Sequence, residues 1–236
     1  MPKKQSNSDN FVARYLAPLI TEFEKAANSE RAAPMSRYMK NRFPFLGITT
    51  PERNEIIKQF IKTYGFPDRA DLFLIIKACY AKPEREYHYF AITLAGKLVK
   101  KAEPNYVEVI EYLVVENGWW DSVDSVLSVC CRPFFKQHIS LQRKITRQWM
   151  DSGNIWLQRS AILFQLNYRS ETNEELLYGY ISELAESKEF FIAKAIGWAL
   201  REYAKTNRKS VEQFLQSQAL QPLSRREAKK HFLKTC

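Results

Sequence analysis

The chain has 236 residues, with 36 Lys and Arg against 26 Asp and Glu, so its formal net charge is +10 at pH 7. A hydrophobic fraction of 45% and an aromatic fraction of 14% exclude a disordered chain, and the length suffices for one substantial core. No apolar run approaches the roughly 20 residues of a membrane helix, and no secretory signal follows Met1. We therefore expect a soluble intracellular protein without a membrane partner, whose positive charge either favours a polyanionic partner or serves solubility alone.

The cysteines, histidines and glycines exclude several kinds of site. The four Cys include an adjacent pair and a terminal residue, so we expect free thiols rather than disulfides. None of the three His stands near a Cys at zinc-ligand spacing, so no metal site is expected. The seven Gly form no phosphate-binding motif, which excludes the common nucleotide cofactors. We predict a protein without cofactor or metal.

Long stretches have apolar residues at spacings of three and four and contain few Gly or Pro, which is typical of helices. The sequence therefore predicts an all-α protein. In chain order, the predicted helices run over residues 10–27, 51–64, 69–80, 84–100, 105–117, 119–133, 138–151, 154–169, 173–185, 188–205, 208–217 and 222–234.

A polar position recurs in the second helix of each predicted pair, at intervals of 35, 36, 35, 35 and 35 residues. These positions are Arg53, His88, Asp124, Arg159, Lys194 and Lys229. This spacing is typical of helical-pair repeats, which stack side by side and bury their faces on their neighbours. We predict an α-solenoid of about six HEAT-like repeats, with residues 1–10 as a flexible lead and residues 11–236 as one domain.

Five of the six recurring side chains can carry positive charge, and equivalent positions in stacked repeats form a continuous stripe. Arg201 and Lys205 extend the helix of Lys194 at positions i+7 and i+11. A stripe of this kind predicts a basic concave groove that follows a phosphate backbone, in competition with the simpler interpretation of a solvated helix face.

Asp124 is the exception in this row. Trp120 lies four residues before it, and Trp198 lies four residues after Lys194, so each indole shares a helix face with a stripe residue. Large indoles exposed on a basic surface are costly unless a ligand covers them. Trp119, Trp149 and Trp156 are expected in the core instead.

The sequence resembles the HEAT-like-repeat DNA alkylation repair enzymes, the AlkD-type alkylpurine DNA glycosylases, from about Arg37 to Lys234. The resemblance rests on the strings Ser36–Asn41, Trp119–Ser125, Asn154–Arg159, Lys188–Ile192 with Ala195–Trp198, and Arg201–Asn207.

By this resemblance, Trp120 and Trp198 are the aromatic walls beside the damaged nucleotide and Asp124 is the catalytic carboxylate. Arg159 contacts the DNA backbone near the lesion, and Tyr38 falls on a DNA-contacting position. The resemblance further implies action on duplex DNA without a base-flipping pocket. We add Arg53, Lys194, Arg201, Lys205 and Lys229 of the basic surface as DNA-binding residues.

The expected activity is hydrolysis of the N-glycosidic bond of cationic N3- and N7-alkylpurines such as 3-methyladenine and 7-methylguanine. These bases leave as neutral molecules, so no general acid is needed, and no Lys is marked as a Schiff-base nucleophile, so no lyase activity is expected. We expect a monomer in a bacterial cytoplasm, on the nucleoid when bound to DNA. The alternatives are a non-catalytic HEAT-like module that binds bent, branched or damaged DNA, and a scaffold for an acidic protein.

Overall fold

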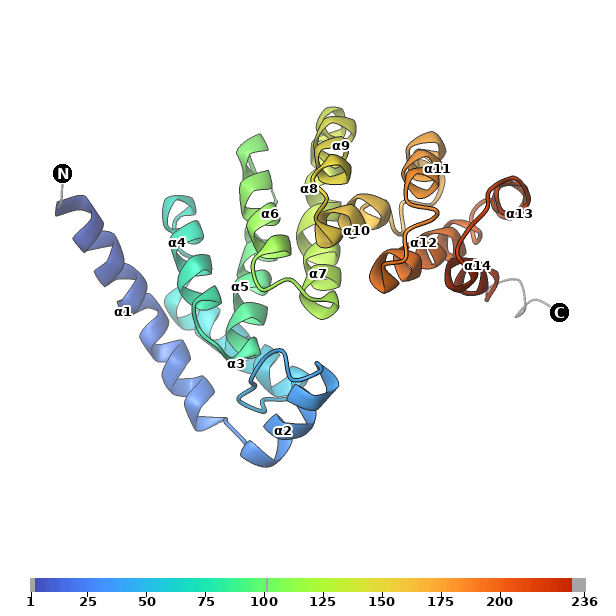
Figure 1. The fold of residues 1–236 in the computed structure, drawn as a ribbon. Helices are drawn as coiled ribbons and strands as arrows, with labels where there is room; N and C mark the ends of the chain where they lie inside the picture. Colours follow the sequence, from blue (N-terminus) through green and yellow to red (C-terminus); the bar gives the residue numbers. More distant parts are fainter. Residues whose placement is uncertain (1–2, 101, 231–236) are drawn as a thin grey trace. The chain divides into compact units, whose positions relative to one another are not determined.

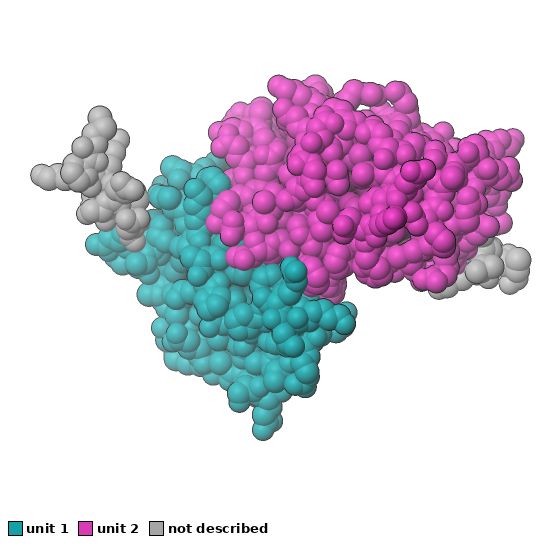
Figure 2. Space-filling model, in the orientation of Figure 1, with its two compact units in different colours: residues 1–100 teal, residues 101–236 magenta. Residues whose placement is uncertain are grey.

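The computed structural model describes residues 3–100 and 102–230, with side chains from residue 10 onward. All elements in these ranges are helices, which confirms the all-α prediction. The chain divides into two compact units, residues 1–100 and 101–236 (Figure 2). The assignment of residues 11–236 to one repeat domain stays a prediction.

The first unit packs its long first helix against the third and fourth, and the fourth against the fifth (Figure 1). Its helices are α1 (Lys3–Lys25), α2 (Ser29–Tyr38), α3 (Thr50–Tyr64), α4 (Arg69–Tyr80) and α5 (Arg85–Leu98). Glu86 is fully buried and accepts hydrogen bonds from the backbone N–H groups of Leu46, Gly47 and Ile48. This carboxylate therefore holds the segment between α2 and α3 against α5.

In the second unit, α10 packs against α7, α9 and α12, and α12 packs closely against α14 (Figure 1). The α-helices are α6 (Val107–Val115), α7 (Trp120–Val126), α8 (Arg132–Gln137), α9 (Gln142–Asp151), α10 (Ile155–Leu163), α11 (Glu174–Glu183), α12 (Phe190–Tyr203), α13 (Arg208–Ser217) and α14 (Pro222–Lys229). The shorter elements are the 3-10 turns η1 (Pro104–Tyr106), η3 (Ile139–Leu141) and η4 (Arg169–Glu171), and the π-helical turn η2 (Leu127–Cys131).

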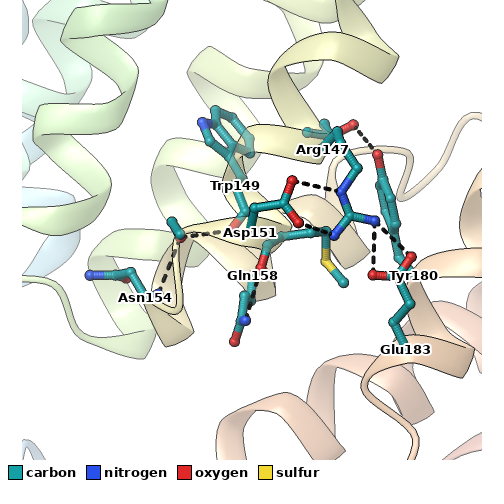
Figure 3. A network of polar contacts seen from close by, with 10 residues as sticks. Arg147, Trp149, Asp151, Asn154, Gln158, Tyr180 and Glu183 are labelled. Atoms are coloured by element: carbon teal, nitrogen blue, oxygen red, sulfur yellow. Dashed lines mark hydrogen bonds and ion pairs between the residues drawn. The ribbon is translucent and has the colours of Figure 1, made fainter.

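Several hydrogen bonds between repeats of the second unit span 34 to 36 residues of sequence. Thr146 bonds to Tyr180 across 34 residues, and Arg147 bonds to Glu183 across 36 residues (Figure 3). A constant separation of this size means that each helical pair repeats its contacts on the next. The predicted period of about 35 residues is therefore present in the packing of this unit.

The core of the second unit contains an aromatic cluster. Phe135 packs against Trp149 and Phe164 at ring-centroid distances of 5.4 and 5.1 Å, and all three side chains are buried. Trp149 also donates from Nε1 to Glu111 Oε1 at 2.7 Å, so its polar atom is satisfied in the core. Burying one such ring contributes roughly 2–3 kcal/mol, which makes this cluster a main source of stability. The expected core positions of Trp149 and Trp156 are confirmed, whereas Trp119, which was expected there too, is only partly buried.

Two elements differ from the predicted helices. Helix α1 begins at Lys3, inside the segment predicted as a flexible lead. The sequence does not predict helix α2, because Pro34 lies within it and it has no apolar face. In the structure, none of its side chains is buried. Asn28 caps this helix by accepting a hydrogen bond from Arg31 N at 2.9 Å, and such a cap offsets part of the cost of an internal proline. The end of the predicted helix 222–234 lies outside the described residues.

None of the described helices combines the length and apolarity needed to cross a membrane. Three cysteines, Cys79, Cys130 and Cys131, are buried free thiols, and Cys236 lies outside the described residues. Burial raises the pKa of the Cys130 thiol to about 12, so it is held protonated in the core.

Candidate active site

An ion pair joins Asp124 of α7 to Arg159 of α10. Arg159 donates from Nε to Asp124 Oδ1 at 3.0 Å and from Nη2 to Oδ2 at 2.9 Å, a bidentate geometry. The Arg159 side chain is 5% exposed, whereas the Asp124 side chain is 24% exposed. The guanidinium thus lies beneath the carboxylate and fixes it in a direction that keeps one side open to solvent.

A third bond ties this pair to the next helix. Arg159 donates from Nη1 to the backbone carbonyl of Phe191 at 2.7 Å, near the start of α12. The Phe191 ring packs against Trp119 and Trp156 at centroid distances of 5.0 Å each, and the two indoles lie 5.6 Å apart. One guanidinium therefore connects α7, α10 and α12 beside an aromatic cluster.

The local sequence explains the position of Asp124. Ser122 Oγ accepts from Trp119 N at 3.3 Å and donates to Trp119 O at 3.1 Å, which caps the start of α7. After Val126 the helix widens into the π-helical turn Leu127–Cys131, in which Leu127, Cys130 and Cys131 are buried. Such turns occur frequently at functional sites, because the extra residue changes which side chains share a face. Trp120 lies one turn before Asp124 and is partly exposed.

Trp198 is on α12 and is also partly exposed. Helix α10 contacts both α7 and α12, so the helix of Arg159 lies between the helices of Trp120 and Trp198. The structure brings Asp124 and Arg159 into contact. Convergence of the two indoles on one nucleotide stays a prediction.

A second charged cluster lies between α12 and α14. Glu227, with 6% of its side chain exposed, pairs with Lys194 at 3.0 Å, with Arg201 at 3.0 Å and with Lys230 at 2.7 Å. Burial acts to raise the pKa of Glu227, but hydrogen bonds from Lys230 and Lys194 outweigh it and lower the pKa to about 2. Sequence reasoning missed Glu227, although it is the one acid between Arg225–Arg226 and Lys229–Lys230.

The remaining predicted DNA-binding side chains reach solvent to different degrees. In the first unit, Tyr38 at the end of α2 is 69% exposed, and the Arg53 guanidinium lies 4.3 Å from the centre of the Tyr89 ring. In the second unit, Lys205 is exposed and pairs with Glu202, and Lys229 is exposed. Their contacts with DNA stay predictions.

The predicted stripe is wrong at His88, which is 1% exposed. Its Nδ1 accepts from Arg85 Nη1 at 3.0 Å and its Nε2 donates to Lys82 O at 2.9 Å, so this imidazole is a satisfied core group. The register also differs at Lys229, which is the last residue of α14, whereas the other five positions lie in the first two turns of their helices.

Comparison with known proteins identifies the family. A family model described as DNA alkylation repair enzyme matches residues 19–232. The chain belongs to this family. A solved structure described as a predicted DNA alkylation repair enzyme from Enterococcus faecalis is 38% identical, with a TM-score of 0.82 over 89% of this chain and 98% of that chain. AlkD2 from Streptococcus mutans shares the fold at 18% identity, with a TM-score of 0.59 over 75% of this chain and 88% of that chain. No match was found among curated proteins.

Membership in the DNA alkylation repair family assigns the chain a role in the repair of alkylation damage, with DNA as its partner. Among residues 3–100 and 102–230, no group of three or more His, Cys, Asp or Glu side chains is arranged to hold a metal ion.

Proposed function

We propose that the protein is a monofunctional DNA glycosylase that releases cationic N3- and N7-alkylpurines from duplex DNA. The observation that carries this proposal is the Asp124 carboxylate, which Arg159 holds by two hydrogen bonds while 24% of the side chain stays open to solvent. Unlike a buried acid that orders surrounding cations, a solvent-open carboxylate such as Asp124 would weaken affinity for a polyanion, so a protein that merely binds DNA gains nothing from it.

The chemistry needs a negative group near the sugar. When the glycosidic bond breaks, its electron pair goes to the alkylated base, which leaves as a neutral molecule, and the sugar becomes an oxocarbenium-like cation. A fixed carboxylate stabilises this cation, and one well-placed electrostatic group contributes about 3–4 kcal/mol to such a step. Water then adds to the sugar carbon and releases a proton to the solvent. Asp124 supplies the charge throughout, and no step forms a bond between enzyme and DNA.

The two indoles suit the cationic base. Trp120 shares the face of α7 with Asp124, and Trp198 stands on α12, where the Phe191 carbonyl accepts from Arg159. An indole face in contact with a cation contributes roughly 0.5–2 kcal/mol, depending on desolvation. In our proposal both rings contact the damaged nucleotide, without a pocket for a flipped base.

Arg159 has a supporting role in this mechanism. Three of its five N–H groups are used by Asp124 and Phe191. Because the side chain is nearly buried, we propose that it acts first by orienting the carboxylate, and that its remaining N–H groups face the backbone phosphate near the lesion.

The decisive experiment measures release of 7-methylguanine from a methylated duplex at saturating enzyme. We expect Asp124→Asn to reduce the rate of release by about 10²- to 10³-fold, because the charge is lost and the shape is kept. Asp151→Asn is the matched control, since Asp151 also accepts hydrogen bonds from an arginine in the same unit but on the helix α9. Its rate should equal that of the wild type.

Two outcomes decide against the proposal. If the wild type releases no alkylpurine yet binds the duplex, the protein is a non-catalytic DNA-binding module. If Asp124→Asn is as fast as the wild type, the carboxylate is not the catalytic group.

A further inference from the structure

The cluster around Glu227 contains more positive charge than is needed to neutralise its one carboxylate. Three cations surround one carboxylate, so the net charge is three minus one, or +2. The carboxylate is 6% exposed, whereas the side chains of Lys194, Arg201 and Lys230 are 38%, 29% and 49% exposed. The acid therefore lies underneath, and each cation keeps part of its surface in solvent.

The helices that carry this cluster are held closely together. A Cβ atom at Gly197 would lie 2.4 Å from Glu227 Cβ and 2.8 Å from Ser224 O, so α14 can approach α12 only because this residue is glycine. Ser224, fully buried, donates to Ala193 O at 3.0 Å and fixes the approach. The carboxylate thus stands on a rigid support, which is what a binding group needs for a defined position.

The cluster also lies next to Trp198. Lys194 precedes this indole by four residues and Arg201 follows it by three on the same helix, so both cations share its face within one turn. The indole that we propose to contact the damaged nucleotide therefore has two cations on its own face of the helix.

We propose that Glu227 is a positioning residue that gathers Lys194, Arg201 and Lys230 into one binding site for a phosphodiester of the DNA backbone beside the nucleotide at Trp198. This inference rests on the proposed contact of Trp198 with DNA. The flexible cations are already ordered by the buried acid before DNA arrives, so binding loses less side-chain entropy. The +2 excess is what remains to attract the phosphate.

The hypothesis makes a prediction opposite to that of net charge alone. Glu227→Gln removes a negative charge and keeps the side-chain shape, so simple electrostatics predicts tighter DNA binding. If Glu227 positions the cations, the variant binds an unmodified duplex about tenfold more weakly, and the slope of log Kd against log salt falls by about one, as for the loss of one phosphate contact. Fluorescence anisotropy of a labelled 20-base-pair duplex at several salt concentrations measures both.

Two further variants separate geometry from charge and from folding. Glu183→Gln makes the same charge change on α11, where Glu183 pairs with Arg147, and should bind DNA as the wild type does. Glu227→Asp keeps the charge of the wild type but shortens the side chain by one methylene, so it cannot reach all three cations, and its affinity should be intermediate. Circular dichroism checks that each variant is folded.

Affinity for Glu227→Gln equal to or tighter than that of Glu183→Gln overturns the positioning role. If Glu227→Gln fails to fold, Glu227→Asp replaces it in the test. A DNA affinity of Glu227→Asp equal to that of the wild type then overturns the positioning role. The excision assay is independent of this result, because a wild type that binds DNA with the expected salt slope but releases no base contradicts the glycosylase and leaves the phosphate site in place.

Discussion

The second unit has two clusters of ion pairs, each of which joins two helices. The two clusters have excess charges of opposite sign. On α9, Arg147 binds Asp151 and Glu183, so one cation faces two acids, for a net charge of −1 (Figure 3). Between α12 and α14, Glu227 faces three cations, for a net charge of +2. The pair Asp124–Arg159 is neutral.

The difference lies in which group is buried. Arg147 is 39% exposed and its acids are 46% and 64% exposed, so the attraction is screened by water and contributes about 0–1 kcal/mol. Hydrogen bonds that Arg147 donates to Glu183 and Asp151 raise the pKa of Arg147 above its ordinary value, so it stays charged at any physiological pH. At Glu227 the buried group is the acid and the exposed groups are cations. The first cluster repels a polyanion, and the second attracts one.

The largest expected effect is at the neutral pair. Arg159→Lys keeps the positive charge but cannot donate two parallel hydrogen bonds, so Asp124 loses its fixed direction. We expect the single-turnover rate of base release to fall by about 10²-fold, the scale of a misplacement of about 1 Å, while duplex affinity changes less than threefold. A rate equal to that of the wild type would show that the bidentate geometry is unimportant for catalysis.

A substitution at Gly197 tests whether the close packing of α14 on α12 holds the Glu227 cluster in place. Gly197→Ala places a methyl group against Glu227 and Ser224 O, and we expect a loss of about 2–3 kcal/mol of unfolding free energy from overpacking, together with weaker DNA binding. Urea denaturation measures the first quantity. Gly179→Ala on α11 is the control, because nothing lies within 4 Å of its added Cβ. It should stabilise the protein by about 0.5–1 kcal/mol. Equal stability of the two variants contradicts the close approach of α14.

The smallest expected effect is on the pH dependence of stability. The pKa of Glu227 is lowered to about 2 in the folded protein from an ordinary value near 4.5. Its ion pairs therefore stabilise the fold fully above about pH 4.5, and this contribution is lost as the pH falls toward 2. The wild type should exceed Glu227→Gln by about 1–2 kcal/mol at pH 6, since partly exposed cations are screened.

The difference in unfolding free energy between the wild type and Glu227→Gln should disappear near pH 2. Urea denaturation across the pH range measures it. Glu183→Gln should differ from the wild type by less than about 1 kcal/mol at pH 6. A Glu227→Gln variant that is as stable as the wild type at pH 6 contradicts the assigned ion pairs.

Helix α2 and the residue Glu227 show where prediction from the sequence stopped. Pro34 and the lack of an apolar face concealed α2, because the cap at Asn28 is a single side-chain contact that periodicity does not detect. Glu227 was overlooked because the repeat register pointed to Lys229, and a register assumes that every helix begins at the same place. In α14 the buried charged residue is Glu227, whereas Lys229 is the exposed last residue of the helix.

The sequence by itself determined the all-helical class, the period of about 35 residues and the resemblance to DNA alkylation repair enzymes. These follow from local spacing, since apolar residues three and four apart dictate helices wherever they pack. The tertiary structure decided which polar positions reach solvent. His88 and Arg159 share their register with Lys194, yet they are buried on partners from Lys82, Arg85, Asp124 and Phe191. Burial and charge pairing depend on groups distant in sequence. The positions predicted as one basic stripe therefore include a buried histidine, an ion pair that orients a carboxylate, and a cluster with an excess of positive charge.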